Sequence, residues 1–181
     1  AGLDAILGGG FPAKRLILIE GEPGTGKTTL ALQFLAAGAA RGSRALFYSI
    51  AQSEEELATI ARSHGLSLDG VEVLSPEIGS SDPRHPVSVA THHSTLADLV
   101  ADLGDRLAAS KPDLLVFDSL LELRLLAPDE FSYRRETLGI RQALRDNGVS
   151  ALVLDHLEPQ GTERHAEGIA HGVIRLTVDT P

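Results

Sequence analysis

The residues whose types and spacing most clearly indicate chemistry lie at positions 21–28, in the order Gly-Glu-Pro-Gly-Thr-Gly-Lys-Thr. This stretch matches the phosphate-cradling pattern G-x-x-x-x-G-K-[ST] at every specified position. Its glycines let backbone N–H groups approach a β-phosphate, its lysine supplies a positive charge, and its last hydroxyl can ligate Mg²⁺. The pattern predicts a nucleoside triphosphate site. The predicted phosphate-binding residues are Gly21, Glu22, Pro23, Gly24, Thr25, Gly26, Lys27, Thr28 and Thr29.

The elements on either side of this loop fit the same interpretation. Leu16 to Glu20 is an apolar run that predicts a buried strand, and residues 27 to about 40 predict a helix that is apolar nearly all round. Such a helix is expected to pack under a sheet. Its N-terminus would add the positive end of its dipole to the phosphate site.

A second chemical residue follows another apolar run. Leu114 to Phe117 predicts a central strand, and Asp118 stands at its carboxyl end. This is the form of a Walker B strand, whose carboxylate can reach the Mg²⁺ held by Thr28, often through water. Apolar strands that end in Asp are common, so the assignment depends on the loop at 21–28. Together they predict Thr28 and Asp118 as the metal residues.

The remaining pattern alternates strands with helices. A capping box at Ser53 and Glu56 predicts the start of a helix with an inward face of Leu57, Ile60, Ala61 and His64. Further strands are expected over 45–50, 71–74, 151–154 and 173–178, further helices over 95–109 and 131–146, and a long excursion over 75–93. The fold class is therefore α/β: one domain over 1–181, with a mainly parallel sheet covered by helices on both faces.

Composition narrows the function classes. Hydrophobic residues make up 43% of the 181, and no apolar run approaches the roughly 20 residues that span a bilayer. No membrane segment and no basic, cleavable start are visible, so the cytoplasm is the expected location, and Ala1 is expected to be an internal or processed start. The net charge of −9 disfavours a protein whose main task is to bind nucleic acid.

Several segments together carry a family resemblance. They are Gly2-Leu3-Asp4 with Gly8-Gly9-Gly10, the loop and helix start over 21–35, residues 118–126, Tyr133-Arg134-Arg135, and residues 169–174. The chain resembles, over nearly its whole length, the KaiC-like ATPases of the RecA superfamily. The resemblance implies a RecA-like P-loop core and ATP with Mg²⁺. It also implies a homo-oligomer, as a hexameric ring or a dimer with nucleotide between subunits, and a role in signal transduction with a signalling protein as partner.

One departure from that family concerns catalysis. In the family the strand after the loop helix ends in a glutamate that polarises the attacking water, whereas the corresponding positions here are Ala51 and Gln52. An amide can orient a water but cannot accept its proton, so slow hydrolysis is expected. One of the residues Glu54 to Glu56 could substitute, but the capping box places them in the first turn of a helix.

A second departure lies at the end of the chain. Relatives continue into a basic segment that can project Lys or Arg toward a neighbour's phosphates, whereas this sequence ends at Asp179-Thr180-Pro181. Either a C-terminal extension is missing from it, or hydrolysis lacks this cation as well.

Other residues have plainer interpretations. Arg134, Arg141 and Arg145 fall on one face of the helix over 131–146 and are expected to be solvated, although a subunit or nucleic-acid contact is the alternative. The histidines at 92, 93, 165 and 171 match no zinc spacing. Asp155-His156 is a candidate γ-phosphate sensor, and the resemblance leaves Glu122 and Arg124 as candidate interface residues.

The leading hypothesis is a slow ATPase or nucleotide-dependent oligomeric switch. In it Lys27 and Asp118 act on the phosphates and the metal, and Gln52 faces the attacking water. A binding-only pseudo-ATPase scaffold is the main rival, because the catalytic carboxylate and the trans-acting cation are both absent from the pattern. A DNA recombination or repair ATPase is a third hypothesis, since the same fold hosts it, and the net charge weakens it.

Overall fold

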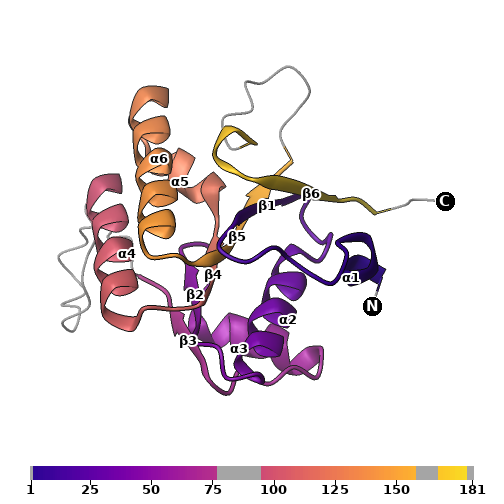
Figure 1. The fold of residues 1–181 in the computed structure, drawn as a ribbon. Helices are drawn as coiled ribbons and strands as arrows, with labels where there is room; N and C mark the ends of the chain where they lie inside the picture. Colours follow the sequence, from indigo (N-terminus) through magenta and orange to yellow (C-terminus); the bar gives the residue numbers. More distant parts are fainter. Residues whose placement is uncertain (1, 77–94, 158–166, 179–181) are drawn as a thin grey trace.

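The computed structural model describes residues 2–76, 95–157 and 167–178, and its centre is one six-stranded parallel sheet. The strand order is β3-β2-β4-β5-β1-β6 (Figure 1). The strands are β1 (Leu16–Gly21), β2 (Ala45–Ser49), β3 (Val71–Leu74), β4 (Leu114–Asp118), β5 (Ser150–His156) and β6 (Gly172–Leu176). The predicted RecA-like α/β fold with a parallel sheet is confirmed, and every neighbouring pair of strands runs in the same direction.

Helices cover both faces of this sheet (Figure 1). On one face lie α2 (Lys27–Ala39) and α3 (Glu54–Ser63); on the other lie α4 (Leu96–Ser110), α5 (Leu120–Leu126) and α6 (Glu130–Asp146). A short α1 (Gly2–Ile6) and a 3₁₀ turn, η1 (Glu167–Ile169), complete the described elements. Among these residues no helix is long and apolar enough to cross a membrane.

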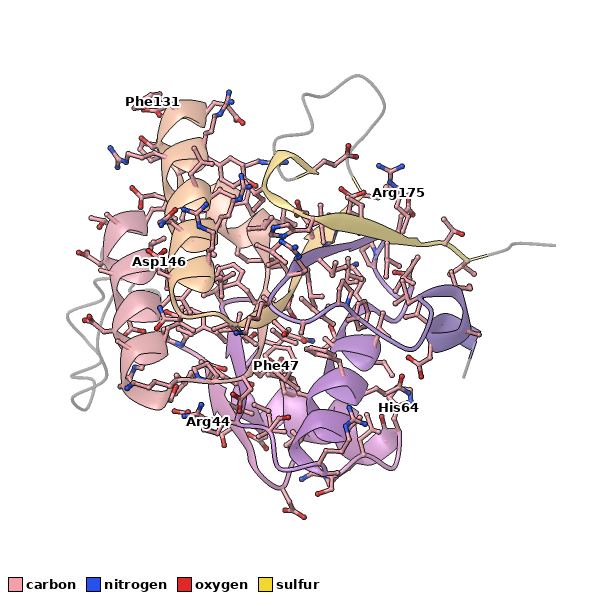
Figure 2. All side chains as sticks on the ribbon, in the orientation of Figure 1. Arg44, Phe47, His64, Phe131, Asp146 and Arg175 are labelled. Atoms are coloured by element: carbon pink, nitrogen blue, oxygen red, sulfur yellow. The ribbon has the colours of Figure 1, made fainter. Side chains whose placement is uncertain are left out.

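Two separate apolar cores follow from the alternation of side chains along each strand. On β2, Leu46 and Tyr48 point to the core under α4, α5 and α6, whereas Phe47 points to the core under α2 and α3 (Figure 2). Because both faces are buried, the central strands are continuous apolar runs rather than alternating ones. All of β1 and all of β2 are buried.

The predicted capping box at the start of α3 is present, but one residue at the end of this helix was predicted wrongly. Ser53 and Glu56 form the expected reciprocal capping box, and Thr95 and Asp98 form another at the start of α4. The prediction that His64 lies on the inward face of α3 is wrong. His64 is the exposed residue that ends this helix, and its Nε2 lies 3.2 Å from the hydroxyl of Thr29 (Figure 2).

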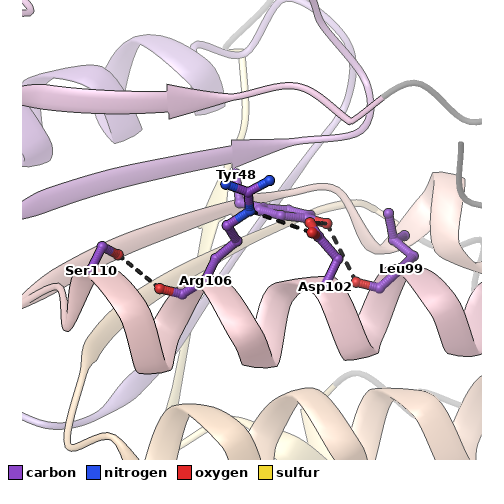
Figure 3. A network of polar contacts seen from close by, with 5 residues as sticks. All are labelled: Tyr48, Leu99, Asp102, Arg106 and Ser110. Carbon is purple, nitrogen blue, oxygen red and sulfur yellow. Dashed lines mark hydrogen bonds and ion pairs between the residues drawn. The ribbon is translucent and has the colours of Figure 1, made fainter. Parts of the chain in front are cut away.

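A buried hydroxyl fixes α4 to the sheet. The Tyr48 hydroxyl donates to the Leu99 carbonyl at 3.3 Å and to the Asp102 carboxylate at 3.0 Å, and Arg106 pairs with Asp102 at 3.4 Å (Figure 3). Burial, and then the charge of Asp102, raise the pKa of Tyr48 far above its ordinary value. The phenol therefore stays protonated and remains a donor across the physiological pH range.

The edge strand β6 is held by an arginine. The Arg175 guanidinium pairs with Glu20 of β1 at 2.8 Å and also with Glu167 of η1. The expected strand over 173–178 instead runs over Gly172–Leu176, because its pairing with β1 stops where β1 stops, at Gly21.

The outer face of α6 is mixed in character. Its buried positions are Tyr133, Thr137, Ile140 and Leu144. Arg134 and Arg145 are exposed, as expected for a solvated face, and so is Phe131, which is 74% exposed at the outer end of the helix (Figure 2). The rest of the predicted excursion, from 77 to 93, and the histidines at 92, 93 and 165 lie outside the described residues.

Gly21, at the end of β1, has no room for a side chain. A Cβ on Gly21 would lie 2.8 Å from the Leu176 carbonyl and 2.5 Å from the Thr25 hydroxyl, so backbone would have to move. Gly21→Ala should lower the free energy of unfolding by about 1–3 kcal/mol, as overpacking usually does. Gly104→Ala in α4 is the control, because its Cβ meets nothing within 4 Å and alanine favours helix. Thermal unfolding measures both. Equal melting temperatures for the two variants would contradict the packing described for Gly21.

Candidate nucleotide site

The candidate site is a hollow of about 410 Å³ at the carboxyl edge of the sheet. Four adjacent strands contribute to it in spatial order: β2 through Gln52, β4 through Asp118, β5 through His156, and β1 through the loop that follows it. Ligands of open α/β sheets bind at this edge. The lining residues are Pro23, Gly24, Gly26, Lys27, Thr28, Thr29, Ala51, Gln52, Ile60, Asp118, Ser119, Glu122 and His156.

The loop itself is shaped by glycine. Gly24 and Gly26 have φ of 81° and 89°, and the space beside each Cα is open. A side chain at either position would be strained and would fill the room that a phosphate needs. Of the predicted loop residues, Gly21, Glu22 and Thr25 do not line the hollow. They form its support, and the Thr25 hydroxyl donates to the Glu22 carbonyl at 2.8 Å.

Lys27 is held over this loop. Its Nζ donates to the carbonyls of Gly21 at 2.7 Å and Glu22 at 3.0 Å. Partial burial lowers the pKa of Lys27, and the charges of Asp118, Asp155 and Glu122 oppose that shift. A cation with only neutral carbonyl partners in a hollow is ready to exchange them for phosphate oxygens, which bind it more strongly.

Asp118 is a buried acid with a strongly altered titration. It is 6% exposed at the end of β4. Burial, followed by the charge of Glu122, raises the pKa of Asp118 to about 7, although Lys27 acts in the opposite direction. The peptide bond between Asp118 and Ser119 is cis. Such a carboxylate lacks compensation in the protein alone and would gain from a cation placed beside it.

The residues present fit a nucleoside triphosphate with Mg²⁺. Open glycine positions, Lys27 and the N-terminus of α2 suit phosphate, and the oxygens of Thr28 and Asp118 are of the kind that Mg²⁺ prefers. Within the described residues no group of three or more His, Asp or Glu could hold a metal. A metal here would therefore share phosphate oxygens, as Mg²⁺ in nucleotide sites does.

Gln52 lines the same hollow and carries a neutral amide. Its backbone is fixed, because its N–H donates to the Ser49 hydroxyl at 2.9 Å and its carbonyl accepts from Ser75 at 2.9 Å. Its side-chain Oε1 is buried without a hydrogen-bond partner. None of the residues Glu54 to Glu56 lines this hollow, and Glu56 is held by Ser53 in the capping box. Of the two positions that end the β2 segment, Ala51 offers no polar group at all.

Glu122 is the lining residue whose role sequence reasoning left undecided. It stands one helical turn after Asp118, in a helix of seven residues that was too short to be predicted from periodicity. Its spacing from Asp118 was the available signal in the sequence that Glu122 could belong to the site. Arg124, the other undecided residue, packs over the Tyr133 ring at 4.8 Å from the ring centre. His156, a candidate phosphate sensor, also lines the hollow, and its backbone N–H donates to the Asp155 carboxylate at 2.8 Å.

A second hollow, of about 640 Å³, lies at the opposite edge of the sheet. It is bounded by the segment that contains Leu3 and Phe11, by Phe34 of α2, and by the residues that begin β4 and β5. Apolar side chains dominate this lining, and the phosphate loop takes no part in it. The smaller hollow is therefore the candidate nucleotide site.

Comparisons with known proteins agree with one another on the family. A family model described as "ATPase: KaiC" matches residues 1–181. The DNA repair protein RadA of Synechocystis is 30% identical over 164 residues, which cover 88% of this chain and 32% of RadA. The circadian clock oscillator protein KaiC of Picosynechococcus is 40% identical over 70 residues, which cover 39% of this chain and 14% of that protein.

A solved structure also matches. A KaiC-like protein from Pyrococcus horikoshii superposes with a TM-score of 0.78 at 24% sequence identity, over 96% of this chain and 76% of that chain, which shows the fold. The chain spans about a third of the length of its RadA relatives.

The buried acid predicts an unusual dependence of stability on pH. Because the pKa of Asp118 is raised in the folded state, the folded state binds more protons than the unfolded state between about pH 4 and 7. Stability is therefore lost as the pH rises through that window. Asp118→Asn should stabilise the chain, measured with EDTA and without nucleotide. Its advantage should grow from about pH 4, reach on the order of 4 kcal/mol near pH 7 and then level off.

Asp113→Asn is the control for this measurement. Hydrogen bonds from Arg44 lower the pKa of Asp113, so that removing this exposed acid should give no advantage that grows with pH. Thermal or denaturant unfolding at several pH values measures both variants. A pH-independent effect of Asp118→Asn, or a loss of stability at pH 8, would contradict the burial argument.

Proposed function

This chain belongs to the KaiC ATPase family of the RecA superfamily, as its motifs indicated, and from that premise we propose that it binds and slowly hydrolyses ATP with Mg²⁺. The proposal rests mainly on one observation: the ends of four adjacent strands bring the loop over 21–28, Asp118, Gln52 and His156 into a single hollow. The family generally binds ATP with Mg²⁺.

Each residue has a defined task in this account. Backbone N–H groups of the loop and the Lys27 ammonium bind the β- and γ-phosphates. Thr28 and Asp118 hold Mg²⁺, which when bound neutralises charge on the phosphate oxygens. Gln52 orients the attacking water, and His156 is placed to hydrogen-bond the γ-phosphate.

Slow turnover follows from the chemistry at position 52. An amide holds a water by hydrogen bonding but takes no proton from it, so any proton acceptor must come from elsewhere in the hollow, and a base that is not held at the end of the β2 segment is expected to support slower turnover. A long-lived ATP complex suits a switch, because the bound state persists long enough for a partner to recognise it. We infer that the nucleotide state controls a homo-oligomer, a ring or a dimer, that acts in signalling.

Surface features support assembly. The hollow is open on its outer side, and four exposed apolar side chains lie on the neighbouring helices α5 and α6: Leu125, Leu126, Phe131 and Leu138. Members of the family often form oligomers. A subunit that covers the hollow could also supply the cation that this sequence does not show.

Two other functions each have one observation in their favour. A binding-only scaffold is favoured by the amide at Gln52, which leaves the end of β2 without a carboxylate. A DNA repair ATPase is favoured by the 30% identity to RadA, but the net charge of −9 disfavours the phosphate contacts that DNA binding needs. Salt-sensitive binding to single-stranded DNA, or turnover stimulated by DNA, would support that role over signalling.

The proposed site is tested by removing its cation. Lys27→Ala should weaken binding of Mg²⁺-ATP by about 100-fold or more while the fold is kept, because charge-assisted contacts to phosphate are lost. Fluorescence titration with a labelled ATP analogue measures the affinity, and circular dichroism checks the fold. Arg145→Ala, which removes an exposed cation of α6 far along the chain, should bind like the unmodified protein. Micromolar affinity retained by Lys27→Ala would contradict the assignment.

Assembly is tested by light scattering during turnover. As a nucleotide-dependent switch, the chain should form its oligomer when Mg²⁺-ATP is added and dissociate as ATP is consumed. Persistence of the oligomer after ADP has replaced ATP would instead support the scaffold. A particle mass that is the same with and without nucleotide would contradict the proposed control of assembly.

A further inference from the structure

Glu122 lines the hollow, although its spacing from Ser119 is that of a capping pair. Ser119 and Glu122 have the S-x-x-E spacing of a capping box at the start of α5, yet the Ser119 side chain makes no capping hydrogen bond. Ser53 with Glu56 and Thr95 with Asp98 have similar spacing, and both pairs form the box. The Ser119 hydroxyl donates to the Glu122 carboxylate, as the Ser53 hydroxyl does to Glu56, but at α5 this carboxylate lines the hollow.

The position of this carboxylate relates it to the reacting groups of the proposed function. Glu122 lines the same hollow as Lys27, Thr28 and Gln52. Its negative charge acts on both Lys27 and Asp118. It is only partly buried, so water can reach it.

Few residues of the hollow can accept a proton from the attacking water. Hydrolysis needs a proton acceptor near the attacking water, and the β2 positions that would supply it carry Ala51 and Gln52. The acidic residues that line the hollow are Asp118 and Glu122. Asp118 is assigned to the metal, which leaves Glu122 as the carboxylate that is free for proton transfer.

We propose that Glu122, held by Ser119, is the general base for ATP hydrolysis in this chain, at a position different from the usual one at the end of β2. The inference rests on the proposed ATPase function. In the step, water oxygen forms a bond to the γ-phosphorus and the bond from that phosphorus to the β,γ-bridging oxygen breaks, with its electron pair leaving on ADP. The proton of the water passes to the Glu122 carboxylate. Ser119 is a positioning residue that orients this carboxylate.

The decisive experiment moves the carboxylate between two positions. Glu122→Gln should lower kcat for phosphate release by about 10²- to 10⁴-fold, as expected for loss of a general base. Adding Gln52→Glu to that variant restores a carboxylate to the hollow, after the end of β2, and should recover at least tenfold of the loss. Glu122→Asp keeps the charge but shortens the side chain, so its kcat should lie between those of Glu122→Gln and the unmodified chain. Glu72→Gln, an exposed change on β3, is the matched control.

ATP affinity is measured on the same proteins by fluorescence titration, independently of turnover. Glu122→Gln should bind Mg²⁺-ATP as tightly as the unmodified chain or more tightly, because a negative charge near the γ-phosphate is removed. Its Mg²⁺ requirement should be unchanged. A raised Mg²⁺ requirement with no rescue by Gln52→Glu would overturn the inference, because Glu122 would then be a metal residue.

Failure of the inference and failure of the proposed function give different results. If Glu122→Gln turns over ATP within twofold of the unmodified chain, Glu122 is not the base, although the ATPase stands. If the unmodified chain binds ATP but releases no phosphate, the inference is overturned and the scaffold function is supported. Absence of ATP binding by the unmodified chain would overturn both.

Discussion

The constraint on which this structure depends is that a parallel sheet brings the carboxyl ends of its strands to one edge. The central strands β1, β2, β4 and β5 are buried among helices, so their polar residues can reach a ligand only where the strands end. With the order β2-β4-β5-β1, the residues Gln52, Asp118, His156 and the loop over 21–28 become neighbours although up to 135 positions separate them in the sequence. Any change that alters strand order or register would separate them.

The charged residues of the hollow lower the stability of the fold but suit the hollow for binding a charged ligand. Lys27 is bonded only to carbonyls in the described structure, and Asp118 is buried with its pKa raised to about 7. Each would be better satisfied by a ligand of the opposite charge. The two apolar cores, together with hydrogen bonds such as that from Tyr48 to Asp102 of α4, stabilise the fold against this cost. Local instability of this kind is common where function requires it.

Much of the fold and the phosphate loop could be predicted from the sequence, because both depend on local signals. Fully buried parallel strands are apolar runs, and the turn at Gly24 and Gly26 requires residues that accept positive φ. The end of β6 at Leu176 could not be predicted, because it depends on where its neighbour β1 ends. His64 was misplaced because the helix ends one residue earlier. Glu122 was left undecided, because a seven-residue helix has no clear periodicity and its direction depends on Ser119.

The most direct test of the central claim is a crystal structure of this chain with Mg²⁺ and a non-hydrolysable ATP analogue. The account predicts that the triphosphate lies in the loop over 21–28, with Lys27 moved from the Gly21 and Glu22 carbonyls to phosphate oxygens and the metal between Thr28 and Asp118. A nucleotide seated in the hollow beside Phe11 and Phe34, or a metal bound away from Asp118, would contradict it.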